Sequence, residues 1–181
     1  IIGGKSMKPT NKQPLFIVTG ASGVGKSTLC EQLFLREKQY IVMESDLLWN
    51  DFYNTPDDDY CEYRRLWMRI CANISQIGMP VMLCGCAVPK QFENQPEREM
   101  FSQIHYLAAV CDTAVLEDRM RRGRKINDEN WIKSSCDFNH WLKQNANNTD
   151  PEITLLDTTD ISPLQAAEAA HKWIMERIGA F

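Results

Sequence analysis

Ten residues near the start of the chain, 19-TGASGVGKST-28, have the types and spacing of a phosphate-binding loop. Gly20, Gly25, Lys26 and Ser27 fit the pattern G-x-x-x-x-G-K-[ST]. Glycines let the loop turn tightly and point N–H groups at one anion, the lysine adds a cation, and the serine hydroxyl can ligate Mg²⁺. The pattern predicts binding of a nucleoside triphosphate, ATP, with Mg²⁺. The residues expected to contact it are Gly20, Ala21, Ser22, Gly23, Val24, Gly25, Lys26, Ser27 and Thr28.

Two further groups of charged residues follow later apolar runs. Asp46 lies in 43-MESDLLW-49, with Glu44 as a weaker candidate beside it. The segment 119-RMRRGRK-125 has five cations among its seven residues. Such a cluster is self-repelling unless an anion binds it, although a solvated helix face is the alternative.

Strands and helices that alternate along the chain are needed to position these groups. The strand-like runs are short, apolar and mostly unbroken, which is typical of strands buried on both faces. Helical periodicity fills the gaps, and the order predicts an α/β fold with a parallel sheet covered on both sides. The expected strands are 15–18, 40–43, 81–84, 104–110 and 153–156, and the expected helices are 26–37, 60–77, 113–122, 128–146 and 163–178. Asp112 and Ser162 are the expected N-caps of two of these helices, with a capping box at Gln165.

Composition indicates one globular domain in a reducing, cytoplasmic setting. The 181 residues carry a net charge of −4, which argues against a nucleic-acid partner, and no apolar run is long enough to cross a membrane. Seven cysteines without a CxxC pair favour buried thiols over disulfides or zinc. Residues 1–13 are expected to be a flexible arm or an expression remnant, and residues 14–181 a single domain.

Other phosphate-loop classes lack their further signatures here. No Asn-Lys-x-Asp base reader of GTPases is present, and the strand 81-VMLC-84 does not end in the carboxylate of motor ATPases. The loop, the acidic residue after the second strand and the basic cluster together resemble the P-loop small-molecule and nucleoside monophosphate kinase-like families. These include adenylate, gluconate, shikimate and chloramphenicol kinases and uncharacterised relatives.

The resemblance implies a three-layer P-loop NTPase fold with strand order 2-3-1-4-5. It also implies a helical lid over about 121–146, and a loop, 157-DTTDISP-163, that lies along the adenine. Lys26 would follow the charge during transfer, Arg119 would meet the adenine side, and Arg122 the transferring phosphoryl group. Arg121 and Arg124 are alternatives to these two arginines.

The acceptor end is expected at the second strand's exit. By the same resemblance, Asp46 would orient an acceptor hydroxyl, take its proton and sit near the metal, and the alternative is a helix N-cap. Aromatic residues can stack on an acceptor ring, and arginines can clamp its phosphate or carboxylate, although core and surface roles are commoner. The candidates are Trp49, Phe52, Tyr53, Tyr60, Arg64, Arg65 and Arg69, with Gly85 allowing close approach to the backbone.

The resulting hypothesis is an ATP-dependent kinase of a small acceptor, a nucleoside or nucleotide. A hydroxyl of a metabolite, antibiotic, sugar nucleotide or polynucleotide is the alternative acceptor. An ATP-binding module whose catalysis has decayed is the alternative from another class. The three histidines have no metal-ligand spacing, and the sequence leaves the oligomeric state open.

Overall fold

A five-stranded parallel sheet is the centre of the fold, as seen in a computed structural model that describes residues 12–36 and 39–179. Its spatial order is β2-β3-β1-β4-β5, so the expected order 2-3-1-4-5 is confirmed. Every neighbouring pair of strands is parallel. The strands are β1 (Leu15–Thr19), β2 (Ile41–Glu44), β3 (Val81–Cys84), β4 (Ile104–Val110) and β5 (Ile153–Asp157).

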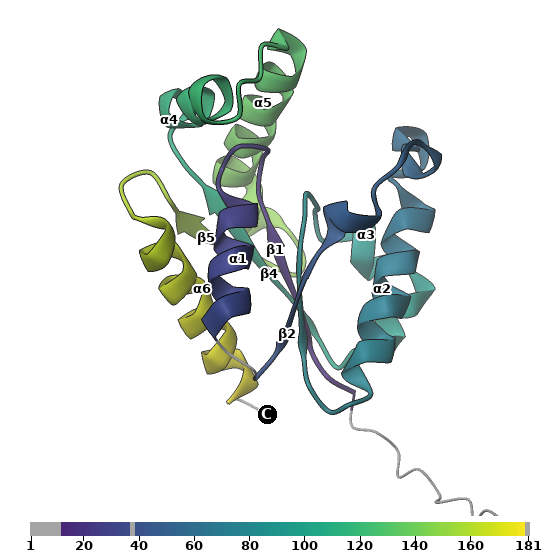
Figure 1. The fold of residues 1–181 in the computed structure, drawn as a ribbon. Coiled ribbons are helices and arrows are strands. Elements are labelled where there is room, and N and C mark those ends of the chain that lie inside the picture. Colours follow the sequence, from purple (N-terminus) through teal and green to yellow (C-terminus); the bar gives the residue numbers. More distant parts are fainter. Residues whose placement is uncertain (1–11, 37–38, 180–181) are drawn as a thin grey trace, which may run out of the picture.

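Helices cover both faces of this sheet, which gives the expected three layers (Figure 1). α1 (Lys26–Arg36) and α6 (Pro163–Ile178) pack on one face, where Phe16 and Val18 join residues of both helices in one core cluster. α2 (Cys61–Ser75) and the end of α5 (Glu129–Asn145) pack on the other face around Leu15 and Ile17. The alternation along β1 therefore fills two separate cores, because successive strand residues point to opposite faces.

Shorter elements occupy the connections near the ends of the strands. The helix α4 (Thr113–Asp118) continues into a π-helical turn, η5 (Arg119–Gly123). The remaining short elements are α3 (Lys90–Glu93), η1 (Ser45–Leu48), η2 (Asp51–Tyr53), η3 (Pro56–Asp58), η4 (Pro96–Met100) and η6 (Ala146–Asn148).

The two helix starts that the sequence predicts, at Asp112 and Ser162, both have these residues at the N-cap position. The capping box of Ser162 and Gln165 is formed, so that prediction is confirmed. Asp112 holds the N-cap position of α4 but makes no capping hydrogen bond. The predicted N-cap position is therefore confirmed, and the Asp112 carboxylate accepts from Lys143 of α5 at 3.1 Å.

The predicted arm at residues 1–13 lies almost wholly outside the described residues, so its boundary stays a prediction. Among the residues that the structure describes, no helix is long and apolar enough to span a bilayer.

Candidate active site

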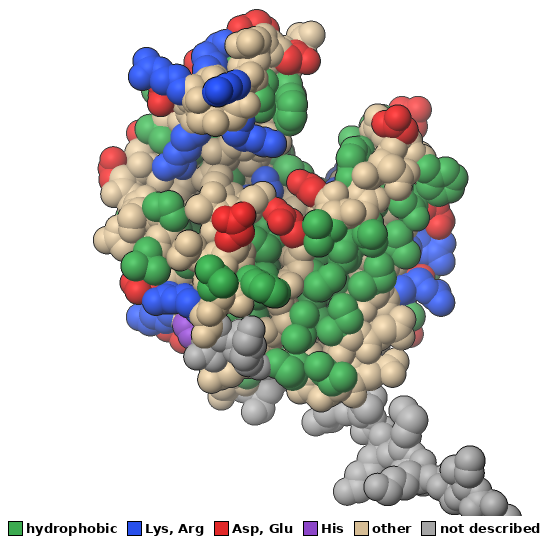
Figure 2. Space-filling model, in the orientation of Figure 1, with side chains coloured by type: hydrophobic (Ala, Val, Ile, Leu, Met, Phe, Trp, Pro, Cys, Tyr) green, Lys and Arg blue, Asp and Glu red, His purple; other side chains and the backbone are tan. Residues whose placement is uncertain are grey.

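A cleft opens at the carboxyl ends of the strands, beside α4 and α5 (Figure 2). It holds a cavity of about 610 Å³, lined by the phosphate loop and by the ends of β2 and β3. Ligands of open α/β sheets bind at this edge, beside a switch in strand order, and β1 lies centrally between β3 and β4 here. The lining residues outside the loop are Leu29, Glu44, Asp46, Cys84, Gly85, Ala109, Arg119, Arg124, Trp131, Thr158, Ile161, Pro163 and Ala166.

The phosphate loop needs glycine at two positions for steric reasons. A Cβ on Gly20 would lie 2.5 Å from the carbonyl oxygen of Ala109, and a Cβ on Gly23 would lie 2.5 Å from Cγ of Met120. Both glycines, like Gly25, also have a positive φ. The loop therefore packs closely against β4 and η5, with backbone angles that favour glycine, and a side chain at either position would clash.

Some side chains of the loop are buried and anchor it, and others line the cleft. Ala21 and Val24 are 1% exposed and pack beneath the lid, so only their backbone groups can face a phosphate. Ser27 and Thr28 are exposed at the start of α1 and line the cavity. Lys26 donates from Nζ to the carbonyl oxygens of Gly20 and Ala21 at 2.8 and 2.9 Å, which keeps its ammonium group over the loop.

Two acidic residues, Glu44 and Asp46, line the same cavity as the loop. Glu44 ends β2, and Asp46 lies inside the turn η1. Glu44, and not Asp46, occupies the N-cap position of that turn, and the Glu44 side chain makes no capping hydrogen bond. The alternative of Asp46 as an N-cap is therefore wrong. The hydrogen bond recorded for the Asp46 carboxylate is from Ser45 Oγ at 3.5 Å, which leaves its oxygens available to a ligand.

These groups fit a magnesium ion. Ser27, Glu44 and Asp46 offer only oxygen donors, which Mg²⁺ prefers, and a bound triphosphate and water would complete its shell. Within the described residues no cluster of three or more His, Cys, Asp or Glu side chains forms a metal site by itself. The metal would therefore depend on the nucleotide, which is usual for Mg²⁺ at phosphate sites.

Two arginines of the basic cluster line the cavity. Arg119 donates to the carbonyl oxygen of Val24 at 3.2 Å and to that of Thr158 at 2.8 Å, so it joins the phosphate loop to the loop after β5. Arg124 lies over the ring of Trp131, 5.5 Å from its centroid. Sequence reasoning did not identify Trp131 as a site residue, and its place within the predicted lid, 121–146, is the signal that could have found it.

The other two arginines of the cluster are engaged with carboxylates. Arg121 makes two hydrogen bonds of 2.6 and 2.7 Å to Glu129. Arg122 Nε forms an ion pair with Asp118 at 2.9 Å, and the Arg122 side chain is 85% exposed. The predicted contact of Arg122 with the transferring phosphoryl group stays a prediction, and Arg124, one of its alternatives, lines the cavity.

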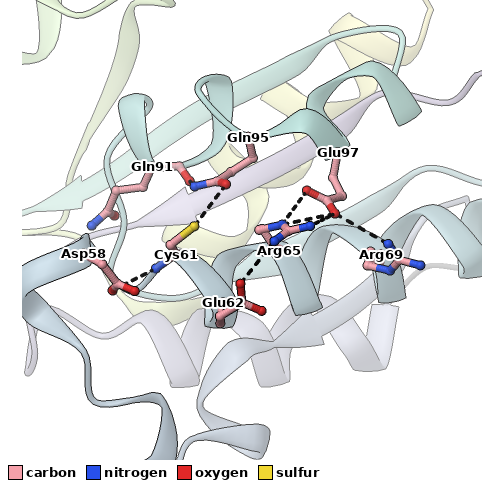
Figure 3. A network of polar contacts seen from close by, with 8 residues as sticks. All are labelled: Asp58, Cys61, Glu62, Arg65, Arg69, Gln91, Gln95 and Glu97. Carbon is pink, nitrogen blue, oxygen red and sulfur yellow. Dashed lines mark hydrogen bonds and ion pairs between the residues drawn. The ribbon is translucent and has the colours of Figure 1, made fainter.

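The expected acceptor residues also divide. Arg65 and Arg69 of α2 both pair with Glu97 of η4, a residue 3% exposed, in the network of Figure 3. Hydrogen bonds from Arg65 lower the pKa of Glu97. The two arginines are therefore structural in this conformation. Arg64, the residue before Arg65, faces a different neighbourhood.

Aromatic residues contact the turn η1 that holds Asp46, and the predicted role of Trp49 in acceptor binding stays a prediction. Trp49 packs edge-on against Tyr63 at 5.2 Å, and the Tyr63 hydroxyl donates to the carbonyl oxygen of Ser45. Close packing requires glycine at position 85, because a Cβ added there would lie only 2.1 Å from Ser45 Oγ. Sequence reasoning missed this constraint. Gly85 also lines the cavity, so its predicted role in close substrate approach stays a prediction.

No protein-family model matches the chain, and no curated protein matches it in sequence. Solved structures do match its fold. A gluconokinase from Sinorhizobium meliloti 1021 is 16% identical with a TM-score of 0.65, covering 93% of this chain and 97% of its own. A sugar kinase from Janibacter sp. HTCC2649 is 18% identical with a TM-score of 0.59, covering 91% and 95%. A shikimate kinase from Acinetobacter baumannii, solved with shikimate, is 16% identical with a TM-score of 0.53, covering 93% and 96%. The chain thus has the fold of the P-loop small-molecule kinases.

Proposed function

We propose that the protein transfers the γ-phosphoryl group of ATP to a hydroxyl of a small molecule. One observation carries this proposal: Asp46 lines the same cavity as Lys26 and Ser27. A carboxylate in that place can receive the proton of an acceptor hydroxyl while the loop holds the phosphates. A phosphate acceptor would need no such base. Nucleosides, nucleotides, sugars, sugar acids and antibiotics with a free hydroxyl all remain candidates.

Phosphoryl transfer depends mainly on positioning and on neutralising charge. The N–H groups of the loop and the start of α1 would hold the β- and γ-phosphates, because both offer unpaired donors and the positive end of a helix dipole. Lys26 would exchange its two carbonyl partners for phosphate oxygens. Mg²⁺, held by Ser27 and Asp46 together with the nucleotide, supplies charge neutralisation.

The acceptor would bind between Asp46 and the loop. Asp46 would orient its hydroxyl in line with the γ-phosphorus and accept the proton as the new O–P bond forms and the bond to the β-phosphate oxygen breaks. Arg124 would face the equatorial phosphate oxygens from the lid, with Trp131 supporting its planar side chain. Arg119 would hold the adenine side between the phosphate loop and Thr158.

The test is acceptor-dependent ADP release with Mg²⁺-ATP and a panel of nucleosides, nucleotides, sugars, sugar acids and aminocyclitols. We expect Lys26→Ala to abolish turnover. We expect Asp46→Asn to lower kcat by on the order of 10²-fold or more. Glu44→Gln is the matched control, because it removes a charge from the same wall without removing the base.

Three results would contradict the proposal in different ways. A near-normal kcat in Lys26→Ala would contradict the assignment of the loop to phosphate binding. Near-normal kcat in Asp46→Asn would exclude the base and favour a phosphate acceptor. Tight ATP binding without turnover of any acceptor would favour the decayed binding module.

A further inference from the structure

Cys86 is the exposed thiol of this chain. The composition favours buried thiols, and four of the seven cysteines are buried, while two are half-buried. All seven lie within the described residues, and Cys86 alone among them is exposed. It directly follows Gly85, which lines the cavity of the candidate active site. A small reagent in solution can therefore reach this sulfur beside the site.

Hydrogen bonds on both sides of Cys86 fix its backbone against the phosphate loop. Thr19, the residue before Gly20, donates from Oγ1 to the carbonyl oxygen of Ala87 at 2.7 Å and accepts from the Ala87 N–H at 2.9 Å. The N–H of Gly85 donates to the carbonyl oxygen of Val18 at 3.1 Å. A group added to the Cys86 sulfur would therefore press on the loop, because the segment cannot swing away without breaking these bonds.

The Cys86 sulfur lies close to the lysine of the phosphate loop. Its Sγ donates to the carbonyl oxygen of Gly20 at 3.2 Å, and Nζ of Lys26 donates to the same oxygen at 2.8 Å. Because both atoms contact one oxygen, they lie no more than about 6 Å apart. The thiol is thus a neighbour of the ammonium group that the proposed function assigns to the phosphates.

A second cation, Arg64 of α2, contacts Cys86 directly. Its Nη2 donates to the Cys86 carbonyl oxygen at 2.7 Å. Arg64 is 7% exposed, and its Nε is buried without a hydrogen-bond partner among the described residues. Burial lowers the pKa of Arg64, whereas charge on Tyr63 and on Cys86 raises it. A negative group formed on Cys86 would therefore lie within electrostatic reach of a cation that has an unused donor.

An exposed thiol beside two cations has the surroundings of a reactive cysteine. Cations stabilise the negative sulfur that attacks an electrophile, whereas thiols buried in apolar surroundings are inert. Two other thiols of the chain provide the contrast. Burial raises the pKa of Cys71 to about 12. Cys136 is half-buried, and burial together with the carboxylates of Glu117 and Asp137 raises its pKa.

We propose that Cys86 is an oxidation site that switches off nucleotide binding. The co-reactant is a hydroperoxide: the sulfur attacks one peroxide oxygen, the S–O bond forms as the O–O bond breaks, and Cys86 becomes a sulfenic acid. The peroxide leaves as water or an alcohol, with the other oxygen and a proton. The sulfur loses two electrons and the peroxide gains them. A small thiol reverses the change through a mixed disulfide.

Oxidised Cys86 would interfere with the phosphate role of Lys26. The new S–O oxygen would accept from Lys26 or Arg64, because both donors are near the sulfur. The ammonium group would then be held away from the phosphates, and the added oxygen would crowd the loop at Gly20. Only this consequence rests on the proposed function, since the reaction itself needs no nucleotide.

The experiment treats the full chain with hydrogen peroxide and maps sulfenic acid at each cysteine by mass spectrometry with a dimedone probe. We expect Cys86 to be converted about tenfold or more faster than Cys136. In parallel, Mg²⁺-ATP is titrated by calorimetry into untreated protein, treated protein and treated protein reduced with dithiothreitol. We expect oxidation to weaken ATP binding by about tenfold or more, and reduction to restore it.

Variants assign these effects to the site. Treated Cys86→Ser should keep the ATP affinity that it has before treatment, whereas Cys136→Ser, the matched control, should lose affinity as the wild type does. Arg64→Met should slow the oxidation of Cys86 by about threefold or more. Arg36→Met, which breaks a surface ion pair with Glu168, should not. The labelling of the wild type needs no variant, so it still tests the inference if Arg64→Met fails to fold.

Three results would overturn the inference. Cys86 could react no faster than Cys136, or its full conversion could leave ATP affinity unchanged. Treated Cys86→Ser could also lose as much affinity as the wild type, which would place the damage at another residue. None of these measurements uses an acceptor. A protein that binds ATP but phosphorylates no acceptor would therefore end the kinase proposal and leave the oxidation site standing.

Discussion

Replacing Gly20 by alanine should damage both the stability of the fold and nucleotide binding. The new Cβ would lie 2.5 Å from the carbonyl oxygen of Ala109 and 2.9 Å from the side chain of Val24, at a φ of +150°. Ala109 belongs to β4, which pairs with β1 and β5 on its two sides, so its backbone cannot move aside easily. Backbone strain costs about 1–3 kcal/mol. Overpacking adds about 1–3 kcal/mol.

The assay is denaturant unfolding of Gly20→Ala combined with calorimetric titration of Mg²⁺-ATP. We expect the free energy of unfolding to fall by about 2–6 kcal/mol, the sum of those two terms, and ATP affinity to fall with it. Gly123→Ala is the matched control, because no atom lies within 4 Å of its Cβ position. It should change stability by less than about 1 kcal/mol. A Gly20→Ala variant as stable as the wild type would refute the close packing of the loop against β4.

Two further predictions concern charged residues. Arg124→Met should lower kcat for phosphoryl transfer by on the order of 10-fold or more, because Arg124 lines the cavity. Arg122→Met should have little effect, because it removes only an exposed ion pair with Asp118. Initial rates of the two variants test this, and equal losses of kcat would contradict the assignment of Arg124 to the site. Glu97→Gln should destabilise the protein at neutral pH. The lowered pKa of Glu97 means that its ionised form contributes stability above its ordinary pKa, and this is lost as pH falls through the lowered value. The stability difference from wild type should therefore shrink in acid, and unfolding curves that keep a constant gap would contradict the role of the ion pairs.

Local patterns in the sequence were enough for the sheet, the helices and the phosphate loop. The apolar runs matched all five strands within one residue at each end, because strands buried on both faces leave a continuous signal. The strand order came from the resemblance rather than from periodicity. Gly20, Gly25, Lys26 and Ser27 are close together in sequence, so their arrangement needs only one turn between β1 and α1.

Residues whose roles depend on distant partners could not be assigned in this way. Arg64 and Arg65 are adjacent and chemically identical, yet one is buried among aromatic rings and the other pairs with Glu97 from η4. Gly85 was linked to substrate approach, whereas the crowding that requires glycine comes from Ser45 across the sheet edge. Each distinction is made by tertiary contacts that helical or strand periodicity does not encode.

The lid arginines show how a local irregularity changes the chemistry that a helix presents. Helical periodicity places Arg122 close to the face of Arg119, because residues three apart are neighbours on an α-helix. The turn η5 is instead π-helical, with Arg124 N–H donating to the Arg119 carbonyl oxygen at 3.0 Å, five residues earlier. The wider turn leaves Arg119 and Arg124 on the cavity and Arg122 in solvent, paired with Asp118. Because π-helical turns are often found at functional sites, we infer that this one selects which arginine can reach a bound phosphate. A variant that removed one residue from η5 should therefore lose phosphoryl transfer while keeping the core that β1 and β4 build.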